Sequence, residues 1–229
     1  MLLIPSPVLV VAAHPDDEAL GCGGTMAKAA AAGAAVHTLF FTNGVDARDT
    51  VSGDDAAARE RADAARRAAH RLGAHEPHIL AFPDNRLDTV AMLDLARAVE
   101  AEIARVQPVV ILTHHADDLN VDHRRVHEAV MTACRPQPGH VVKHILCFEV
   151  ASSTEWRAPR ASAAFVPQLF VDIGTHLDDK LQALRAYDAE MRPWPHARSI
   201  EAVGHLARWR GASVGVSAAE AFMVARVTL

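Results

Sequence analysis

The sequence is poor in the features that mark several large classes of protein. Its three cysteines, Cys22, Cys134 and Cys147, are too few and too scattered for a disulfide framework or a CxxC zinc site. Such sparse cysteines suit a reducing compartment, and we expect a cytoplasmic protein. There is no long run of lysine or arginine, and the formal net charge is −5. A nucleic-acid-binding protein that works by neutralising phosphates is therefore disfavoured.

Membrane and export signals are missing as well. No apolar run reaches the length of a membrane span, so no transmembrane segment is expected. The opening residues, MLLIPSP, have no basic segment and contain two prolines, which predicts that they are not a signal peptide. What the chain does have is an apolar content of 50% and a charged content of 22% over 229 residues. These values are typical of one soluble globular domain, here residues 1–229.

Strand-like and helix-like patterns alternate through the first 134 residues. Short apolar runs of strand length are followed by longer segments with apolar residues at helical spacing. This alternation predicts an α/β fold with a mostly parallel sheet and helices on both faces. The expected strands are 8–13, 35–41, 79–82, 108–113, 144–150, 168–173 and 221–227, and the expected helices are 25–32, 54–72, 92–106, 124–134, 177–191 and 200–211. We expect a core over residues 8–150 and a less regular part, residues 151–229, that completes the site.

A histidine and three carboxylates close the first strand. Residues 14–18 read HPDDE, and Pro15 prevents the strand from continuing. Three carboxylates repel one another unless a cation lies among them, and histidine and aspartate are both good Zn²⁺ ligands. The alternative is a solvated acidic turn at the start of the next helix, where aspartate is favoured. Gly21, Gly23 and Gly24 then predict a glycine-rich loop before the helix over 25–32.

A second group of histidines and carboxylates closes the fourth strand. Residues 114–123 read HHADDLNVDH, and loops after the strands of a doubly wound sheet can converge at one edge. His14, Asp17 and His123 would then form a three-ligand set with one open coordination position, which marks a catalytic zinc. A zinc ion lowers the pKa of its bound water and polarises a carbonyl group. Asp16, a neighbouring carboxylate that is not used as a ligand, is placed to act as general base.

These residues resemble those of a known family. The HPDDE segment, the glycine-rich sequence after it, and Asp122-His123 at the head of a later helix are similar to the PIG-L/LmbE-type zinc-dependent de-N-acetylases, which are N-acetylglucosaminyl deacetylase-like. The resemblance implies a Rossmann-like α/β sheet and a zinc-dependent amidohydrolase that acts on linear amide C–N bonds. It implies a small-molecule N-acetylated sugar of the N-acetylglucosamine type as the substrate. It also implies that His14, Asp17 and His123 are the ligands and that Asp16 is the general base.

One position departs from the family pattern. Several members carry a histidine three residues before the third ligand, where it stabilises the oxyanion or protonates the leaving amine, and here that residue is Asn120. An amide donates a hydrogen bond but delivers no proton. We therefore expect Asn120 to assist catalysis as an oxyanion donor. The donor of the proton is open among Asp16, His115 and His196.

Four further residues each have two interpretations. Glu18 is expected to orient the loop of residues 14–18 rather than to bind the metal. Asp122 either hydrogen-bonds behind a ligand or caps the helix that follows. Arg86 and Arg198 are candidates for holding sugar hydroxyls or a phosphate, although arginines are also common on protein surfaces.

Aromatic and proline-rich segments of the C-terminal part suggest a rim to the site. Trp156 and Trp194 could each stack on a sugar ring, or equally belong to the core. Residues 192–199, RPWPHARS, form a stiff loop with two prolines, a tryptophan and a histidine. We expect this loop to border the substrate pocket, with Arg198 pointing inward and His196 among the substrate contacts.

Two other functions remain open on the sequence. One is a metal-dependent deacylase that acts on a non-sugar amide in a biosynthetic pathway. The other is a nucleotide-binding α/β module without hydrolytic activity. Against that module, the first turn lacks GxGxxG and places carboxylates where a phosphate needs backbone donors. The alanine-rich helices permit a homo-oligomer of undetermined symmetry.

Overall fold

The strands form one mixed sheet at the centre of the molecule. The computed structural model describes residues 5–45, 54–158 and 164–229. Within these residues a seven-stranded sheet has the order β3-β2-β1-β4-β5-β7-β6. The strands are β1 (Val8–Ala12), β2 (Val36–Phe40), β3 (His78–Ile79), β4 (Val110–His114), β5 (His144–Phe148), β6 (Leu169–Asp172) and β7 (Ala219–Val227). β1 to β5 pair in parallel, whereas β7 is antiparallel to both β5 and β6.

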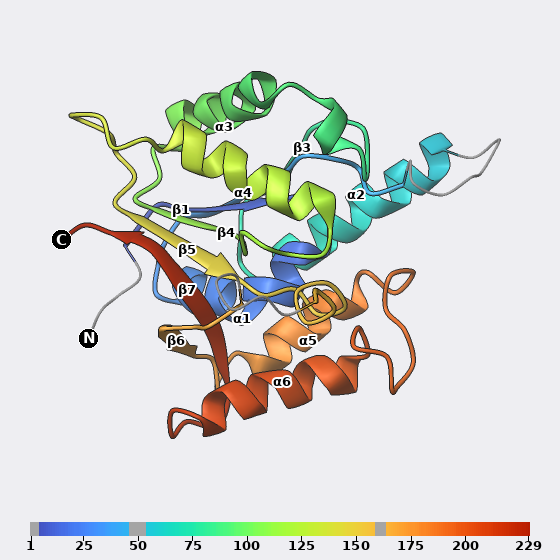
Figure 1. The fold of residues 1–229 in the computed structure, drawn as a ribbon. Coiled ribbons are helices and arrows are strands. Elements are labelled where there is room, and N and C mark those ends of the chain that lie inside the picture. The colour runs from blue at the N-terminus through green and yellow to red at the C-terminus, as the bar shows by residue number, and fades with distance from the viewer. Residues whose placement is uncertain (1–4, 46–53, 159–163) are drawn as a thin grey trace.

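Helices cover both faces of this sheet, as the alternating pattern predicts. They are α1 (Asp17–Ala31), α2 (Asp54–Arg71), α3 (Met92–Val106), α4 (Val121–Ala133), α5 (Leu177–Arg185) and α6 (Ile200–Ala212), with a short 3₁₀ helix η1 (Leu87–Thr89). α3 and α4 lie on one face, and α1, α5 and α6 lie on the other (Figure 1). No helix among the described residues combines the length and the apolar character needed to cross a membrane.

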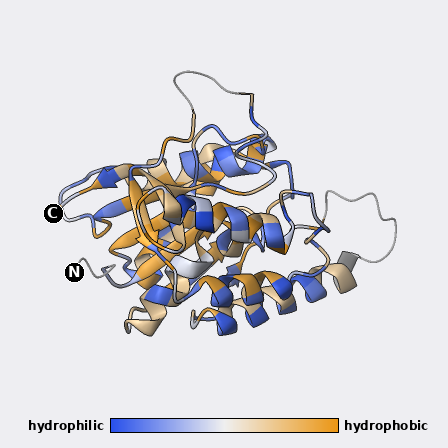
Figure 2. Cartoon of the chain, turned by 90° about the horizontal axis from the view of Figure 1, so that it is seen from below, coloured by the Kyte–Doolittle hydropathy of each residue, from blue (hydrophilic) through white to orange (hydrophobic). Residues whose placement is uncertain are grey.

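The central strand β1 shows why the sheet needs both layers. Its five residues, VLVVA, are all buried. Val8 and Val10 pack in the cluster that includes α1, α2 and α5, while Leu9 and Val11 pack in the cluster that includes α3 and α4. Side chains of a strand alternate between faces, so a strand covered on both faces is apolar throughout. Figure 2 shows the same arrangement, with hydrophobic residues gathered in the sheet and beneath the helices.

The strand order places the two polar loops side by side. β1 pairs with β2 on one side and with β4 on the other. β2 and β3 therefore lie on one side of β1 in the sheet, and β4 and β5 lie on its other side. At such a switch point the loops after the two adjacent strands diverge and leave a crevice at their carboxyl ends. Residues 14–18 and 114–123 follow β1 and β4 at this point.

The first helix begins earlier than its sequence pattern suggests. α1 starts at Asp17 rather than at residue 25, so Gly21 and Gly24 lie inside a helix and not in a loop. Tight packing explains these glycines. A Cβ at Gly21 would lie 2.2 Å from the Phe148 ring, and one at Gly24 would lie 2.7 Å from the Ile173 side chain. The helix is kinked at Cys22, where the backbone is not helical (φ −145°, ψ 20°).

Three other boundaries differ from the sequence prediction by three residues or more. α4 begins at Val121 rather than at residue 124, which puts His123 in its first turn. β3 pairs through only two residues, because it is the edge strand and the chain turns away at Pro83. The predicted helix over 177–191 stops at Arg185. Beyond it, backbone N–H groups donate to carbonyls three residues back, as in Tyr187 to Leu184, so the segment 186–191 forms turns.

Candidate active site

The loop after β1 sends its neighbouring carboxylates in different directions. The Asp17 side chain is fully buried, and its Oδ2 accepts a hydrogen bond from the backbone N–H of His14 at 2.9 Å. Asp16 has a φ of 126°, a value that residues with a side chain rarely adopt. A conformation of this kind costs about 1–3 kcal/mol and persists only where the surroundings impose it. Asp17 faces the histidines of the site, whereas Asp16 faces Arg198.

His14, Asp17 and His123 form a buried cluster. One ligand atom of each lies within 4.8 Å of those of the others. Asp17 Oδ2 is 3.2 Å from His14 Nδ1 and 3.3 Å from His123 Nε2. Asp17 Oδ1 is buried without a hydrogen-bond partner, and His123 Nε2 has the ion-pair contact with Asp17 but no hydrogen bond, which is costly for buried polar atoms. A divalent metal ion would satisfy both atoms, and the donor set of two imidazoles and one carboxylate fits zinc.

Each histidine of this cluster is held from behind by carboxylates. His14 Nε2 is 3.1 Å from Asp84 Oδ1 and 3.2 Å from Asp122 Oδ2. His123 Nδ1 is 3.1 Å from Asp118 Oδ1. These contacts leave His14 Nδ1 and His123 Nε2 directed at Asp17. A carboxylate behind a histidine fixes the tautomer and the ring orientation of a metal ligand and makes it more basic.

The oppositely charged groups of the cluster stabilise one another's ionised forms. Burial raises the pKa of Asp17, but the positive charge of His123 and the hydrogen bonds from His123 and His14 outweigh burial and hold that pKa well below its usual range. Burial lowers the pKa of His123, but Asp17 and Asp118 raise it to about 9. Without a metal the cluster is thus held together by protonated histidine and ionised aspartate. Metal ligation requires neutral histidine, so a metal ion would compete with these protons.

The ring of His114, the last residue of β4, stacks against the ring of His123. The two rings stack with centroids 3.9 Å apart and an interplanar angle of 14°. His114 Nε2 accepts a hydrogen bond from the backbone N–H of Ala13 at 2.9 Å, so its proton is on Nδ1. Burial holds the pKa of His114 well below its usual range, and the ring stays neutral. Its neighbour His115 instead meets the edge of the Phe165 ring, with centroids 5.5 Å apart.

Asp16 is paired with Arg198 from the C-terminal part. Arg198 Nη1 donates to Asp16 Oδ2 at 2.8 Å, and Arg198 Nε donates to Ser152 Oγ at 2.7 Å. Asp16 Oδ1 is buried without a hydrogen-bond partner. Burial raises the pKa of Asp16 to about 6, against the lowering effect of the Arg198 charge. The loop of residues 192–199 therefore lies against residues 14–18 with Arg198 pointing inward, and its contact with substrate stays a prediction.

The head of α4 is organised by Asn120 and Asp122. Asn120 is the N-cap: its Oδ1 accepts from the backbone N–H of Asp122 at 2.8 Å, and its Nδ2 donates to Asn85 Oδ1 at 3.2 Å. The alternative that Asp122 caps the helix is therefore wrong. Asp122 accepts instead from the backbone N–H groups of Asn85 (2.7 Å) and Leu87 (3.0 Å) and contacts His14. The expected oxyanion role of Asn120 stays a prediction.

The remaining predicted residues lie in different surroundings. Arg86 is exposed and precedes η1. Trp156 is 53% exposed, and its ring meets His196 edge-to-face with centroids 5.5 Å apart. His196 Nδ1 accepts from the backbone N–H of Arg198 at 3.0 Å, which links the Trp156–His196 pair to the Asp16 contact. Trp194 is also exposed, so neither tryptophan belongs to the core.

Glu18 lies behind Asp16 and not in the ligand cluster. Its Oε2 accepts from the backbone N–H of Asp16 at 3.1 Å, and its Oε1 accepts from the Tyr187 hydroxyl at 2.7 Å. The sequence had given no reason to select Tyr187, because its contact spans 169 positions of the chain. Asp84, Asp118 and His114 were missed too. Their only signal was a place in a polar loop or at a strand end, which many other residues share.

Comparison with known proteins identifies sequence relatives of this chain. The sequence model of the PIG-L family, described as GlcNAc-PI de-N-acetylase, matches residues 9–134. The uncharacterized deacetylase YaiS of Escherichia coli is 30% identical over 186 residues, which cover 79% of this chain and 89% of YaiS. The 1D-myo-inositol 2-acetamido-2-deoxy-alpha-D-glucopyranoside deacetylase 1 of Saccharopolyspora erythraea is 28% identical over 243 residues, which cover 84% of this chain and 80% of that protein.

Solved structures share the fold over nearly the whole chain. The conserved protein TT1542 from Thermus thermophilus superimposes with a TM-score of 0.77 at 26% identity, covering 98% of this chain and 97% of its own. GalB, the 4-carboxy-2-hydroxymuconate hydratase of Pseudomonas putida, superimposes with a TM-score of 0.76 at 24% identity, covering 98% and 99%. The likeness to GalB shows the fold alone. Because the family's sequence model spans more than half of the chain and covers β1, β4 and all three residues of the buried cluster, this chain belongs to the PIG-L family.

Proposed function

We propose that this chain is a zinc-dependent hydrolase that removes the acetyl group from an N-acetylated amino sugar or glycoconjugate of the N-acetylglucosamine type. One observation carries the proposal. Three buried ligand residues, two of which (Asp17 and His123) have ligand atoms without a hydrogen bond, lie beside a second carboxylate that has one oxygen free. Hydrolysis of an amide needs both a site that polarises the carbonyl and a base that activates water, and this arrangement supplies a place for each.

His14, Asp17 and His123 would hold the zinc ion. When bound there, zinc supplies a Lewis acid that polarises the acetamide carbonyl and lowers the pKa of a water molecule beside it. The carboxylates of Asp84, Asp122 and Asp118 keep the two imidazole rings aimed at the site. His114 adds a flat, neutral surface beneath His123.

Asp16 would act as the general base. Its Oδ1 is free to accept a proton from the attacking water, while Arg198 holds its Oδ2. A pKa near 6 leaves this carboxylate ionised at neutral pH and still basic enough to take a proton. The new C–O bond forms first, while the carbonyl oxygen takes up negative charge. The C–N bond then breaks as the carbonyl re-forms, and the leaving amine needs a proton. Asp16 could return the one it took, and His115 and His196 remain the alternative donors.

The relatives support an acetamido sugar as the substrate. The Saccharopolyspora protein is named for the deacetylation of an inositol-linked 2-acetamido-2-deoxyglucoside. In this chain the exposed Trp156 offers an apolar surface on which a sugar ring could stack, and Arg86 is free of any described ion pair and could reach a hydroxyl or a phosphate. A deacylase for a non-sugar amide would use the same chemistry, so only its substrate distinguishes it from the proposed enzyme. A nucleotide-binding module without hydrolysis has no use for the buried ligand cluster.

A substrate panel tests the proposal. Purified protein, assayed for bound metal by mass spectrometry, is incubated with N-acetylglucosamine, diacetylchitobiose, an inositol glycoside of N-acetylglucosamine, a nucleotide-linked form and a simple acetanilide. Release of acetate from one or more acetamido sugars, abolished by a chelator and restored by zinc, is expected. Acetate release from the anilide alone would favour the non-sugar deacylase. No acetate release from any compound by zinc-loaded protein would overturn the proposal.

A further inference from the structure

Both ends of the Pro15–Asp16 peptide group are held by buried side chains. The Pro15 carbonyl accepts a hydrogen bond from Arg61 Nη1 at 3.0 Å. The Asp16 N–H donates to Glu18 Oε2 at 3.1 Å. A peptide group is planar and moves as one unit, so fixing its C=O and its N–H fixes the orientation of the whole plane.

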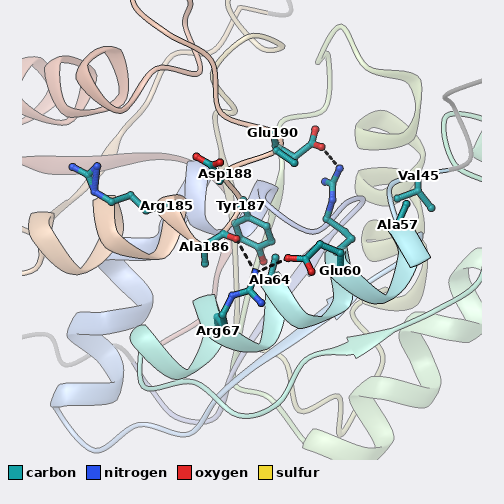
Figure 3. Close-up of a pocket in the computed structure, with 12 residues that line it drawn as sticks. Val45, Ala57, Glu60, Ala64, Arg67, Arg185, Ala186, Tyr187, Asp188 and Glu190 are labelled. Carbon is teal, nitrogen blue, oxygen red and sulfur yellow. Dashed lines mark hydrogen bonds and ion pairs between the residues drawn. The ribbon is translucent and has the colours of Figure 1, made fainter. Parts of the chain in front are cut away.

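Each of these side chains is itself held by the short segment after α5. Arg61, on α2, forms an ion pair with Glu190 and also donates to the Gly44 carbonyl at 3.3 Å. Glu18 accepts from the Tyr187 hydroxyl at 2.7 Å. Tyr187 and Glu190 line one cavity of about 400 Å³ between α2 and the segment 186–191. Figure 3 shows both residues, and its dashed line at Glu190 marks the ion pair with Arg61, which the figure leaves unlabelled.

The clamped peptide accounts for the unusual backbone of Asp16. At a φ of 126° the Asp16 backbone would relax if the Pro15–Asp16 plane could rotate. That rotation would break the contacts to Arg61 and Glu18 and would turn the Asp16 side chain relative to Asp17. Hydrogen bonds at both ends of the plane oppose it.

We propose that Tyr187 and Glu190 are positioning residues, which act through Glu18 and Arg61 to clamp the Pro15–Asp16 peptide and so aim the Asp16 carboxylate. The proposal rests on the proposed function only where Asp16 is taken to be the base. It concerns residues beyond the part matched by the family's sequence model, which ends at residue 134.

A purely structural role is the competing explanation, because a buried carboxylate and a buried guanidinium need partners in any event. Conservative variants separate the two. Tyr187→Phe removes one hydroxyl and keeps the ring, and Glu190→Gln removes a charge and keeps an acceptor. Glu102→Gln is the matched control: Glu102 is a buried carboxylate paired with an arginine, Arg105, on the opposite face of the sheet.

The experiment combines steady-state kinetics, zinc content, thermal unfolding and hydrogen exchange at the Asp16 amide. In Tyr187→Phe and Glu190→Gln we expect kcat to fall roughly tenfold or more, because small displacements of a reacting group are costly. KM and zinc content should stay near the wild-type values. Exchange at the Asp16 amide should accelerate in both variants. Glu102→Gln should change neither kcat nor that exchange rate. The double variant should lose less than the product of the single losses, since both act on one peptide.

Unchanged kcat and unchanged protection of the Asp16 amide in both variants would overturn the inference. So would a loss of kcat that accompanies a lower Tm while the Asp16 amide keeps its protection. If the wild-type protein releases acetate from no substrate, the proposed function fails instead. Exchange at the Asp16 amide still decides whether the clamp exists. If one variant does not fold, the other alone carries the test.

Discussion

Arg198 Nη1 lies 2.8 Å from Asp16 Oδ2, although 182 positions separate the two residues along the chain. The contact joins the segment that follows β1 to the loop that precedes α6. It engages one carboxylate oxygen of Asp16 and leaves the other free. The free oxygen of Asp16, the proposed general base, is thereby held in one orientation toward the proton that it would accept.

Removal of Arg198 should therefore change the behaviour of Asp16, the proposed base, in two respects. In Arg198→Met we expect kcat to fall roughly tenfold, because the Asp16 carboxylate loses its orientation. The Arg198 charge lowers the pKa of Asp16, so without it that pKa rises. A base works only above its pKa, so the acidic limb of the kcat/KM profile should move to higher pH. Arg192→Met, an exposed arginine of the same loop, is the control and should leave the profile in place. An unshifted profile in Arg198→Met would disprove the coupling.

The two adjacent aspartates should respond differently to substitution. Asp16→Asn should keep zinc and lose about 10²–10⁴ in turnover, as expected for removal of a general base. Asp17→Asn should lose both zinc and turnover, since Asp17 faces both histidines of the cluster. Metal analysis of each purified variant, alongside kcat, checks this. Near-normal activity of zinc-loaded Asp16→Asn would place the base elsewhere.

Asp118 should control zinc affinity without touching the metal. In Asp118→Asn the charge behind His123 is lost, and we expect zinc affinity to fall about 10- to 100-fold. Asp117→Asn is a matched control, because the neighbouring Asp117 pairs with Arg157 and contacts no residue of the cluster. Competition with a chromogenic chelator measures both affinities. Equal affinities in the two variants would remove Asp118 from the support of the site.

The glycines inside α1 should differ in their tolerance of alanine. A Cβ at Gly21 would lie 2.2 Å from the Phe148 ring, whereas one at Gly23 would lie 3.4 Å from its nearest neighbour, Lys180. We expect Gly21→Ala to lower the free energy of unfolding by about 1–3 kcal/mol or more, as overpacking does. Gly23→Ala should stay near the wild-type stability, and thermal unfolding compares them. If Gly21→Ala is as stable as Gly23→Ala, the Phe148 ring moves to accommodate the added methyl group and the prediction is wrong.

The sheet and the adjacent placement of its two polar loops were predictable because strand ends carry a strong local signal. A valine-rich run that stops at HPDDE, and a second that stops before HHADDLNVDH, place both polar groups at the carboxyl ends of parallel strands. The helix over 92–106 was predicted to the residue, since its apolar spacing is regular. The start of α1 was not predicted, because glycine disfavours a helix locally. Only the close approach of Phe148 and Ile173 requires glycine at positions 21 and 24.

The contacts around the candidate ligands were harder to predict. His114 and His115 are adjacent and identical in type, and only the strand alternation realised in β4 decides which ring stacks on His123. Several aspartates occur in each polar loop, and the sequence does not tell which of them reaches a histidine, as Asp84 and Asp118 do. Tyr187 and Arg198 reach residues 14–18 from distant positions, so no local pattern reveals them.

The split of the site between two parts of the chain has a consequence for protein engineering. The candidate ligands lie within residues 14–123, whereas Trp156, His196 and Arg198 come from the later segment. A graft that exchanges residues 192–199 for the equivalent loop of a relative would rebuild the rim and leave the ligand frame intact. We expect such chimaeras to accept a new substrate before they lose metal binding, provided that the graft begins after Glu190 and keeps an arginine opposite Asp16.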